Sequence, residues 1–288
     1  MDKLMELILF RPSLSSLVAK ELASPGNSSS LMAAVVRRFL ESRAGFLQKA
    51  AVKLLEIQPD DVVLGVGHGR GIGLRCAYGR VAQGEGQIFG TETSPRLIAK
   101  AEKYCALEML ENKVHSIRAN SGHLPFPDNV FDKVFHVDSF YFWPSLTRGN
   151  TELFRVLKAE HTFTPGGRLV CTLYMEDLKK FEASGALKYA KTTDPLDYLL
   201  SLEETGFRDV KVRYFPFKDK LVYQGIFATK PAQVDQDQDL ITDESIASLK
   251  KIVQDDMRRE IITQFERPIR KDEAEKLLKD EQARKDDK

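Results

Sequence analysis

Cysteine is scarce in this chain: its 288 residues include three, at positions 76, 105 and 171, and no two of them form a C-x-x-C pair. This number excludes a disulfide framework of the kind that stabilises small secreted domains, and the spacing does not match a zinc site. The five histidines show no ligand spacing such as H-x-x-x-H, so the sequence predicts no metal centre. We expect a reducing, cytoplasmic location, with a mitochondrial one as the alternative.

The chain also lacks a large net charge and a long apolar run. Its 43 basic and 42 acidic side chains leave a formal charge of +1, which excludes a general attraction to nucleic acid. The first apolar stretch is cut by Arg11 and Pro12 and is too short to span a bilayer. We therefore expect no transmembrane segment and interpret this stretch as a helix packed on its own domain. With 42% hydrophobic and 30% charged residues, the composition is that of a globular protein.

Three regions are predicted along the chain: an N-terminal helical extension over 1–57, a core over 58–230 and a charged helical tail over 231–288. Lys230 and Pro231 end an apolar run, and a polar linker rich in Asp and Gln follows them. Residues 232–288 hold 12 basic and 16 acidic side chains, so acids are in excess there. We interpret the tail as a solvated segment that offers a surface to a protein partner.

Within the core, short apolar runs alternate with segments of helical spacing, which is typical of an α/β fold with a mostly parallel sheet. The expected strands are 61–66, 87–91, 114–119, 131–137 and 168–173, followed by 210–215 and 221–229. The expected helices between them are 70–81, 95–110, 146–158 and 195–205. Because only the turn-like segment 217–220 separates the last two strands, we expect them to pair antiparallel.

The most informative segment is a glycine-rich turn after the first expected strand. Gly67, Gly69 and Gly71 alternate with other residues directly before an expected helix. Glycine permits positive φ angles and a close approach of the backbone to a ligand, and a helix N-terminus offers free N–H groups. The G-x-G-x-x-G pattern of nicotinamide dinucleotide sites is not met, because Ile72 stands where the third glycine would be. The turn indicates a different ligand, or a tight turn without one.

Four motifs, in this order, resemble those of a known family. They are residues 67–71, residues 90–95 (Gly-Thr-Glu-Thr-Ser-Pro), residues 124–132, and residues 155–158 with 165–169. Over residues 45–230 the sequence resembles the class I S-adenosylmethionine-dependent methyltransferases, type 11, a group that includes quinone-biosynthesis enzymes. The resemblance implies a Rossmann-like sheet of seven strands, mostly parallel with an antiparallel last strand, and S-adenosyl-L-methionine as the cofactor.

The resemblance also implies a cofactor site, made of Gly67, His68, Gly69, Gly71, Glu92, Thr93, Asn120, Ser121 and Leu124. Glu92 falls on the position of the acid that binds the ribose hydroxyls, and an ionised carboxylate suits a diol. Its alternative role is to cap the next helix, although Ser94 looks like the better cap. Asn120 falls where the family has an acceptor for the adenine amino group, with a turn-forming role as the alternative. For His68 the alternative is a loop residue without a role.

Gly65 departs from the family pattern. The family has Glu or Asp two residues before the first motif glycine, where the acid supports the glycine turn and the methionine end of the cofactor, whereas this chain has glycine. Either cofactor binding is weakened or another residue takes over that support. Arg70 within the turn is also unusual, and we expect its side chain to point to solvent.

The acceptor is expected beyond the strand that ends at residue 137, because ligands of open α/β sheets bind outside the carboxyl ends of strands. Residues 136–144 include four aromatic side chains, which predict either an apolar pocket or a part of the core. The resemblance places acceptor contacts in this segment. The catalytic candidates are therefore His136 as a base, and Asp138 and Tyr141 as acceptor contacts.

The predicted function is the transfer of a methyl group to a small organic or lipid-like acceptor. Such a transfer needs aligned reactants and the exclusion of water, and it needs no metal. By the resemblance, expected helices at 31–40 and 46–55 cover the acceptor pocket. The alternative is a methyltransferase-like scaffold with weak or no catalysis that acts through its tail, which Gly65 favours. A dehydrogenase is a third hypothesis, and it requires a nicotinamide cofactor.

Overall fold

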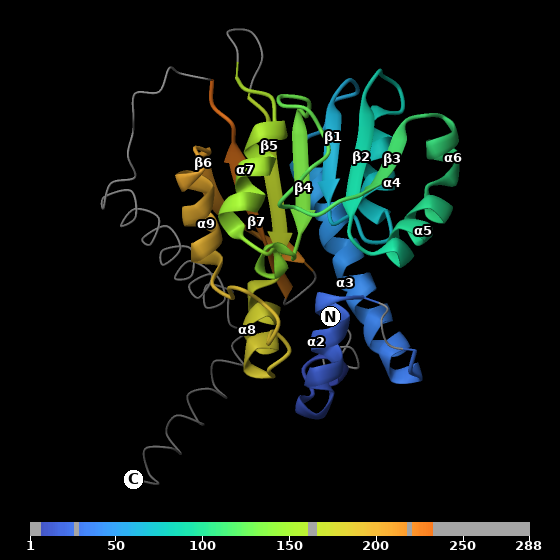
Figure 1. Cartoon of the computed structure of the whole chain (residues 1–288), viewed down its shortest axis with the longest axis vertical. Coiled ribbons are helices and arrows are strands. Elements are labelled where there is room, and N and C mark those ends of the chain that lie inside the picture. Colours follow the sequence, from blue (N-terminus) through green and yellow to red (C-terminus); the bar gives the residue numbers. More distant parts are fainter. Residues whose placement is uncertain (1–6, 26–28, 161–165, 218–220, 233–288) are drawn as a thin grey trace, which may run out of the picture.

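The computed structural model describes residues 7–25, 29–160, 166–217 and 221–232, and its centre is a seven-stranded sheet (Figure 1). The strands are β1 (Val62–Val66), β2 (Gln87–Glu92), β3 (Val114–Arg118), β4 (Lys133–Val137), β5 (Arg168–Leu173), β6 (Arg208–Phe217) and β7 (Leu221–Thr229). Their order is β3-β2-β1-β4-β5-β7-β6. Strands β1 to β5 are parallel, and β7 is antiparallel to both of its neighbours. The predicted sheet with an antiparallel last strand is confirmed.

The strand order reverses between β1 and β4. Strands β2 and β3 extend the sheet on one side of β1, and β4 and β5 extend it on the other. In open α/β sheets, ligands bind outside the carboxyl ends of the strands at such a switch point. Val66 pairs with His136 near these ends, so the chain after each strand leaves the sheet at the same edge. The topology thus places the glycine turn beside the expected acceptor segment.

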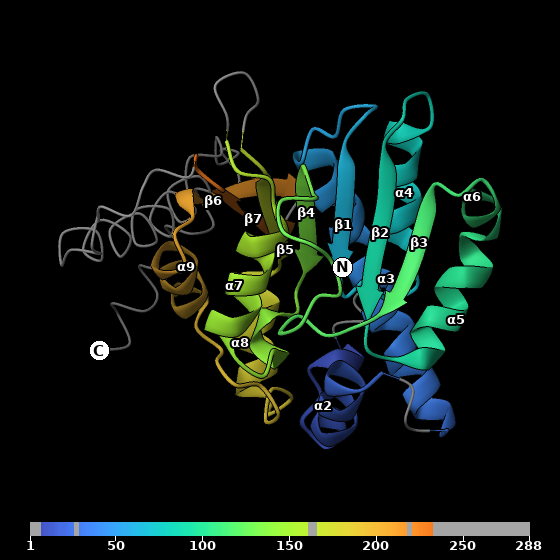
Figure 2. The ribbon, with the colours of Figure 1, turned by 45° about the horizontal axis from the view of Figure 1, so that its top comes forward.

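Helices cover both faces of the sheet. The helices are α2 (Ser15–Ala23), α3 (Leu31–Leu54), α4 (Ile72–Val81), α5 (Pro95–Tyr104), α6 (Ala106–Leu110), α7 (Leu146–Val156), α8 (Met175–Ala183) and α9 (Pro195–Glu204), with short 3₁₀ turns η1 (Pro12–Leu14) and η2 (Phe140–Phe142). One buried cluster joins α3 and α4 to the sheet, and a second joins α7, α8 and α9 to its other face. Figure 2 shows α4 behind the sheet and α7 in front of it.

α3 is one continuous helix of 24 residues, so the prediction of two separate helices at 31–40 and 46–55 is wrong. The residues between the two predicted helices continue α3: Arg43 is buried in ion pairs, and Gly45 packs tightly. A Cβ at Gly45 would lie 2.7 Å from Cδ1 of Ile72, so glycine permits the close approach of α3 to α4. Ser30 caps the helix by accepting a hydrogen bond from the N–H of Ala33 at 3.1 Å.

Two limits of the described residues concern the sequence predictions. No helix within the described ranges is long and apolar enough to cross a membrane. The predicted charged tail, 231–288, lies outside the described residues apart from its first two positions.

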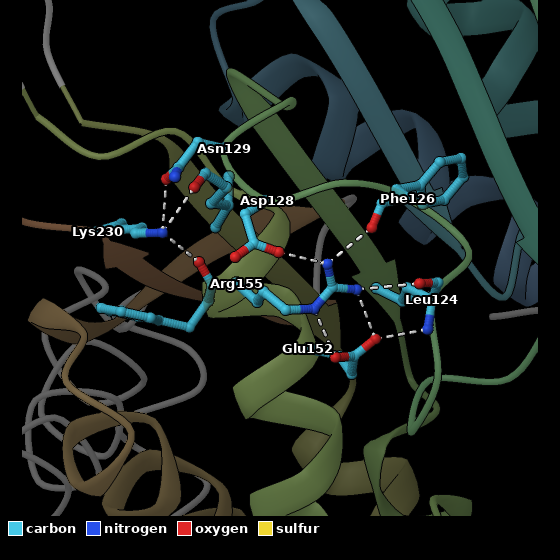
Figure 3. A network of polar contacts seen from close by, with 9 residues as sticks. Leu124, Phe126, Asp128, Asn129, Glu152, Arg155 and Lys230 are labelled. Carbon is cyan, nitrogen blue, oxygen red and sulfur yellow. Dashed lines mark hydrogen bonds and ion pairs between the residues drawn. The ribbon is translucent and has the colours of Figure 1, made fainter.

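The chain that returns from β3 to β4 is fixed to α7 by a polar network (Figure 3). The Arg155 guanidinium donates to the carbonyl oxygens of Leu124 and Phe126 at 3.0 and 2.7 Å, and it forms ion pairs with Asp128 and Glu152. The last contacts come from Lys230, whose ammonium donates to Asn129 Oδ1 and to the carbonyls of Phe154 and Leu157. These bonds satisfy carbonyl groups at the end of α7.

Candidate functional site

A cavity opens at the carboxyl ends of β1, β2 and β4, where α2 and α3 cover it. Its empty volume is about 830 Å³ when the open solvent space at its mouth is included. The polar residues of its wall are Glu21, Arg37, Glu41, Arg43, Gln48, Arg70, Glu92 and Asp138, and its apolar side chains include Leu22, Leu40, Ile72, Leu97 and Val137. The position is the one at which ligands of α/β sheets bind.

The glycine turn forms the floor of this cavity. Gly67, Gly69 and Gly71 have φ angles of 67°, 58° and 82°, in the region that only glycine adopts without strain. Gly67 and Gly69 line the cavity, and a Cβ at Gly67 would have no atom within 4 Å. Gly71 instead serves helix packing, because a Cβ there would lie 3.1 Å from Ala101 and Cys105. The turn therefore leaves open space on its cavity side.

Glu92, the last residue of β2, lines the cavity and binds the glycine turn. Its Oε2 accepts a hydrogen bond from the N–H of Gly69 at 3.0 Å, and its Oε1 accepts from the N–H groups of Thr93 and Ser94 at 2.8 and 3.0 Å. Both N–H groups belong to residues before α5, so Glu92 orders the turn that precedes this helix and does not bind the N–H groups of its first turn, as the capping alternative required. Ser94 occupies the predicted N-cap position directly before Pro95, but its side chain makes no capping bond.

The side chain of His68 points away from the cavity. It is buried, with Nε2 2.8 Å from Oγ of Ser116 and Nδ1 3.1 Å from the carbonyl of Gly69. Burial lowers the pKa of His68, although the nearby Glu92 carboxylate opposes this shift. The imidazole therefore connects the glycine turn to Ser116 of β3. Its position does not favour the predicted contact between His68 and the cofactor.

Gln48 of α3 is a residue of this site that the sequence reasoning missed. Its Nε2 donates to the carbonyl of His68 at 3.2 Å, and its Oε1 accepts from the N–H of Gly73 at 2.8 Å. The side chain is buried, and its two bonds hold the glycine turn at His68 and the helix start that follows it at Gly73. A signal was available, because Gln48 stands on the helix face that Ala51 and Val52 make apolar.

The structure explains why position 65 carries no acid. A Cβ at Gly65 would lie 2.7 Å from Cζ of Phe135 and 3.1 Å from Cδ2 of Leu74. The Phe135 ring on the neighbouring strand β4 fills the space that a side chain at position 65 would need. An acid at this position is incompatible with the packing of this core.

The three candidates after β3 lie outside the cavity wall. Asn120 is exposed, and its Oδ1 accepts a hydrogen bond from the N–H of Gly122 at 2.9 Å, so it has the turn-forming role given above as the alternative. Leu124 is buried in the main hydrophobic cluster, and Ser121 is also buried. A part of the site that includes these three residues remains a prediction.

Asp138 lies at the far end of the cavity, directly after β4, in an ion pair with Arg43. Arg43 also donates from Nε to Asp177 of α8 at 2.8 Å, and the rings of Tyr174 and Phe181 lie about its guanidinium at 5.1 and 5.4 Å. The side chains of Arg43 and Asp138 are 4% and 5% exposed. Within the described residues, Asp138 Oδ1 and Arg43 Nη2 have no hydrogen-bond partner.

This arrangement is costly unless a ligand completes it. Two carboxylates share one guanidinium, and a buried polar atom without a partner costs about 1–3 kcal/mol. Asp138 also has a φ of 49°, a strained conformation for a residue other than glycine. Unsatisfied, strained polar groups of this kind cluster at functional sites. Asp138 was predicted as an acceptor contact, whereas Arg43 was missed, although it is an arginine on a helix that packs against the core.

His136 and Tyr141 lie in the core and not in the cavity. His136 is fully buried, with Nε2 2.6 Å from the hydroxyl of Tyr198, and burial lowers its pKa to about 3. Burial also raises the pKa of Tyr141, whose ring packs against Phe140. Phe140 and Trp143 belong to the same hydrophobic cluster. The core interpretation of this aromatic segment is therefore correct, and the position of His136 does not favour its predicted role as a base.

Ion pairs connect the helices that cover the cavity. Arg37 of α3 forms two hydrogen bonds with the buried carboxylate of Glu21 on α2, at 2.9 and 3.1 Å. Glu41 of α3 pairs with Arg70 of the glycine turn at 3.0 Å and with Lys100 of α5 at 2.7 Å. The Arg70 side chain is 45% exposed, as expected, and it forms its ion pair with Glu41 at the surface.

Known proteins resemble a part of this chain. Residues 64–171 match a family model described as a methyltransferase domain. A demethylmenaquinone methyltransferase of Symbiobacterium thermophilum is 30% identical over 139 residues, which are 48% of this chain and 53% of that protein. A sterol 24-C-methyltransferase of Pneumocystis carinii is 33% identical over 111 residues, 38% of this chain and 27% of that protein. The chain thus spans about half or less of the length of these curated relatives.

Among solved structures, a chain of the complex between the Trm112 methyltransferase activator of Haloferax volcanii and a methyltransferase has a similar fold. Its TM-score is 0.54 at 19% identity, and the match covers 67% of this chain and 93% of that chain.

Proposed function

We propose that this chain transfers a methyl group from S-adenosylmethionine to a small organic or lipid-like acceptor. The premise is that residues 64–171 belong to the class I S-adenosylmethionine-dependent methyltransferase family, type 11. The observation that carries the proposal lies at the switch point of the sheet, where Gly67 and the carboxylate of Glu92 line the same cavity and a Cβ at Gly67 would meet no atom within 4 Å. We call this pair of residues the cradle.

The residues of the cavity fit this cofactor. Its lining side chains include four carboxylates and three guanidinium groups, so one negative charge is in excess. S-adenosylmethionine carries a sulfonium and an ammonium group against one carboxylate, so the charges of cavity and cofactor are complementary. The backbone at Gly67 and Gly69 permits close approach, and Glu92 is the acid for the ribose hydroxyls. Glu92 already accepts three bonds on Oε1, from Thr93 and Ser94, and one on Oε2, from Gly69, so Oε2 is the oxygen that retains an acceptor position for a ribose hydroxyl.

When bound, the cofactor supplies a methyl group on a sulfonium, and its sulfur is left as a neutral thioether after the transfer. The chain contributes alignment of the reactants and exclusion of water, for which α2 and α3 form the cover. For an acceptor that must lose a proton, Asp138 Oδ1 is the atom that takes it, because this oxygen has no other partner within the described residues. Arg43 holds the carboxylate in place through its second contact with Asp177.

A lipid-like acceptor is supported by two observations. The relatives named above are a demethylmenaquinone and a sterol methyltransferase, and both names refer to largely apolar molecules. The cavity wall combines its charged groups with aliphatic side chains from α2, α3, α5 and β4, which suits an apolar molecule with a polar end.

The second candidate function is a scaffold with weak or no catalysis, and Gly65 favours it. The experiment is a calorimetric titration of the full chain with S-adenosylmethionine, followed by incubation with methyl-labelled cofactor and a panel of hydroquinones, phenols and sterols. Saturable binding and label in an organic acceptor are expected. Absence of binding overturns the enzyme proposal and favours the scaffold, whereas binding without transfer to any acceptor overturns the acceptor class.

A further inference from the structure

Helix α3 contacts the glycine turn through the side chain of Gln48. Gln48 lies outside residues 64–171, the segment that matches the methyltransferase family model. Its amide nevertheless contacts the turn at His68, between the first two of the three glycines with positive φ, and at Gly73, two residues after the third. A turn with so many glycines loses much conformational entropy when it is ordered. Two hydrogen bonds from another helix, one within the turn and one directly after it, reduce the conformational freedom that remains.

Gln48 also replaces a missing helix cap. The N-terminal residue of α4 is preceded by Gly71, which has no side chain to accept a hydrogen bond from the first turn. The N–H of Gly73 belongs to the four donors at the start of α4 that have no partner within the helix. Oε1 of Gln48 accepts from this N–H at 2.8 Å, so a residue of another helix caps α4.

The packing leaves no space at position 65 for a side chain that could support the glycine turn. Any side chain there meets the ring of Phe135 within 2.7 Å. Gln48 approaches the turn from the other side, and its Nε2 would lie 3.5 Å from a Cβ at Gly69. Its nitrogen donates to a carbonyl and its oxygen accepts from an N–H, so an amide fits both contacts and a carboxylate fits one.

We propose that Gln48 is a positioning residue of the cofactor site, which holds the glycine turn in its binding conformation in place of the acid that position 65 lacks. This inference rests on the proposed function. It makes the cofactor site dependent on an N-terminal helix and not on the matched segment alone.

The test uses Gln48→Met in the full chain, since methionine is similar in length and forms neither hydrogen bond. The matched control is Gln224→Met, because Gln224 is also buried and its Oε1 accepts from the N–H of Met175 at 2.8 Å, away from the cavity wall. The first measurement is amide hydrogen exchange of residues 67–73 without ligand. The second is the Kd for S-adenosylmethionine.

The expected result for Gln48→Met is faster exchange in the turn and a rise in Kd of roughly tenfold, which corresponds to about 1.4 kcal/mol. Gln224→Met should lower the melting temperature without either change, and Gln48→Glu should give an intermediate Kd. An unchanged Kd, or unchanged exchange in residues 67–73, overturns the proposal even if Gln48→Met is less stable. If the unmodified chain binds no cofactor, the proposed function fails as well, and the exchange data still report whether Gln48 orders the turn.

Discussion

The carboxylate of Glu92 accepts a hydrogen bond from the backbone N–H of Gly69 at 3.0 Å, so the end of β2 and the glycine turn after β1 are joined directly. Glu92 uses both of its oxygens as acceptors from backbone groups. Because the same carboxylate faces the cavity, changes at Glu92 affect both the shape of the turn and the charge that a ligand meets.

The Glu92→Gln variant should lose both affinity and stability. An amide has one oxygen, so its NH₂ group would face a backbone N–H, and hydrogen bonds to a charged group contribute about 1.5–3 kcal/mol. We expect the Kd for S-adenosylmethionine to rise at least about tenfold and the melting temperature to fall. The control is Glu85→Gln, at an exposed position before the other end of β2. An unchanged Kd in Glu92→Gln would remove Glu92 from the site.

The Gly67→Ala variant tests the open space of the cradle. A methyl group at this position meets no atom within 4 Å, so the cost is backbone strain at a φ of 67°, about 1–2 kcal/mol. Because Gly67 lines the cavity, we expect weaker cofactor binding by calorimetry. Gly79→Ala in α4 is the control, because its Cβ also meets nothing and alanine in a helix is favoured by about 1 kcal/mol. Equal affinities of the two variants would contradict the cradle.

The Gly65→Ala variant should be destabilised by about 1–3 kcal/mol, since its Cβ overlaps with Phe135. The measurement is chemical denaturation. In the double variant with Phe135→Leu, the smaller side chain should recover a part of this loss, and the difference gives the coupling energy of the pair. Additive effects would mean that position 65 is not limited by the ring.

The Asp138→Asn variant separates the two roles that a carboxylate could have at the end of β4. If Asp138 Oδ1 takes a proton from the acceptor, kcat falls by about 10²–10⁴ while the Kd of the cofactor changes little. Steady-state kinetics with an identified acceptor, together with cofactor titration, measure both values. A rise in the cofactor Kd at unchanged kcat would instead assign Asp138 to the cofactor.

Stability should fall on acidification because of His136. The pKa of His136 is about 3 in the folded protein, whereas an exposed histidine has a pKa of about 6.5. Between these values the unfolded chain binds more protons than the folded one, so the free energy of unfolding decreases as pH falls from 6.5 toward 3. The slope for one group is at most about 1.4 kcal/mol per pH unit. His136→Gln should flatten the curve of melting temperature against pH and retain kcat. A hundredfold loss of kcat would restore His136 as the base.

The strands were predictable because parallel strands are buried on both faces and form continuous apolar runs. The predicted run 168–173 has the bounds of β5, and the other predicted strands of the core agree within two residues. Helix α8 was missed, although Glu176 and Asp177 in its first turn are typical of a helix start. The continuity of α3 could not be read from its pattern, because its central polar residues find their partners elsewhere in the fold.

The candidate site divides in the same way. Residues whose role depends on the local backbone could be predicted from the sequence, and Gly67, Gly69 and Glu92 do line one cavity. Contacts between distant segments are not: Arg43 meets Asp177 across 134 positions, and Gln48 meets Gly73 across 25. Burial of His68 and His136 was equally hidden, because a histidine suits either a cavity or the core until its surroundings are known.

The unbroken length of α3 couples the entrance of the cavity to its floor. A helix of 24 residues is a rigid rod of about 36 Å, with Arg37 and Glu41 at the mouth and Gln48 at the glycine turn. Where such a rod moves as one body, the ion pairs of Arg37 and Glu41 and the amide that caps α4 move together. A shift in the packing of α2 on α3 would therefore reach the first turn of α4 through one continuous element.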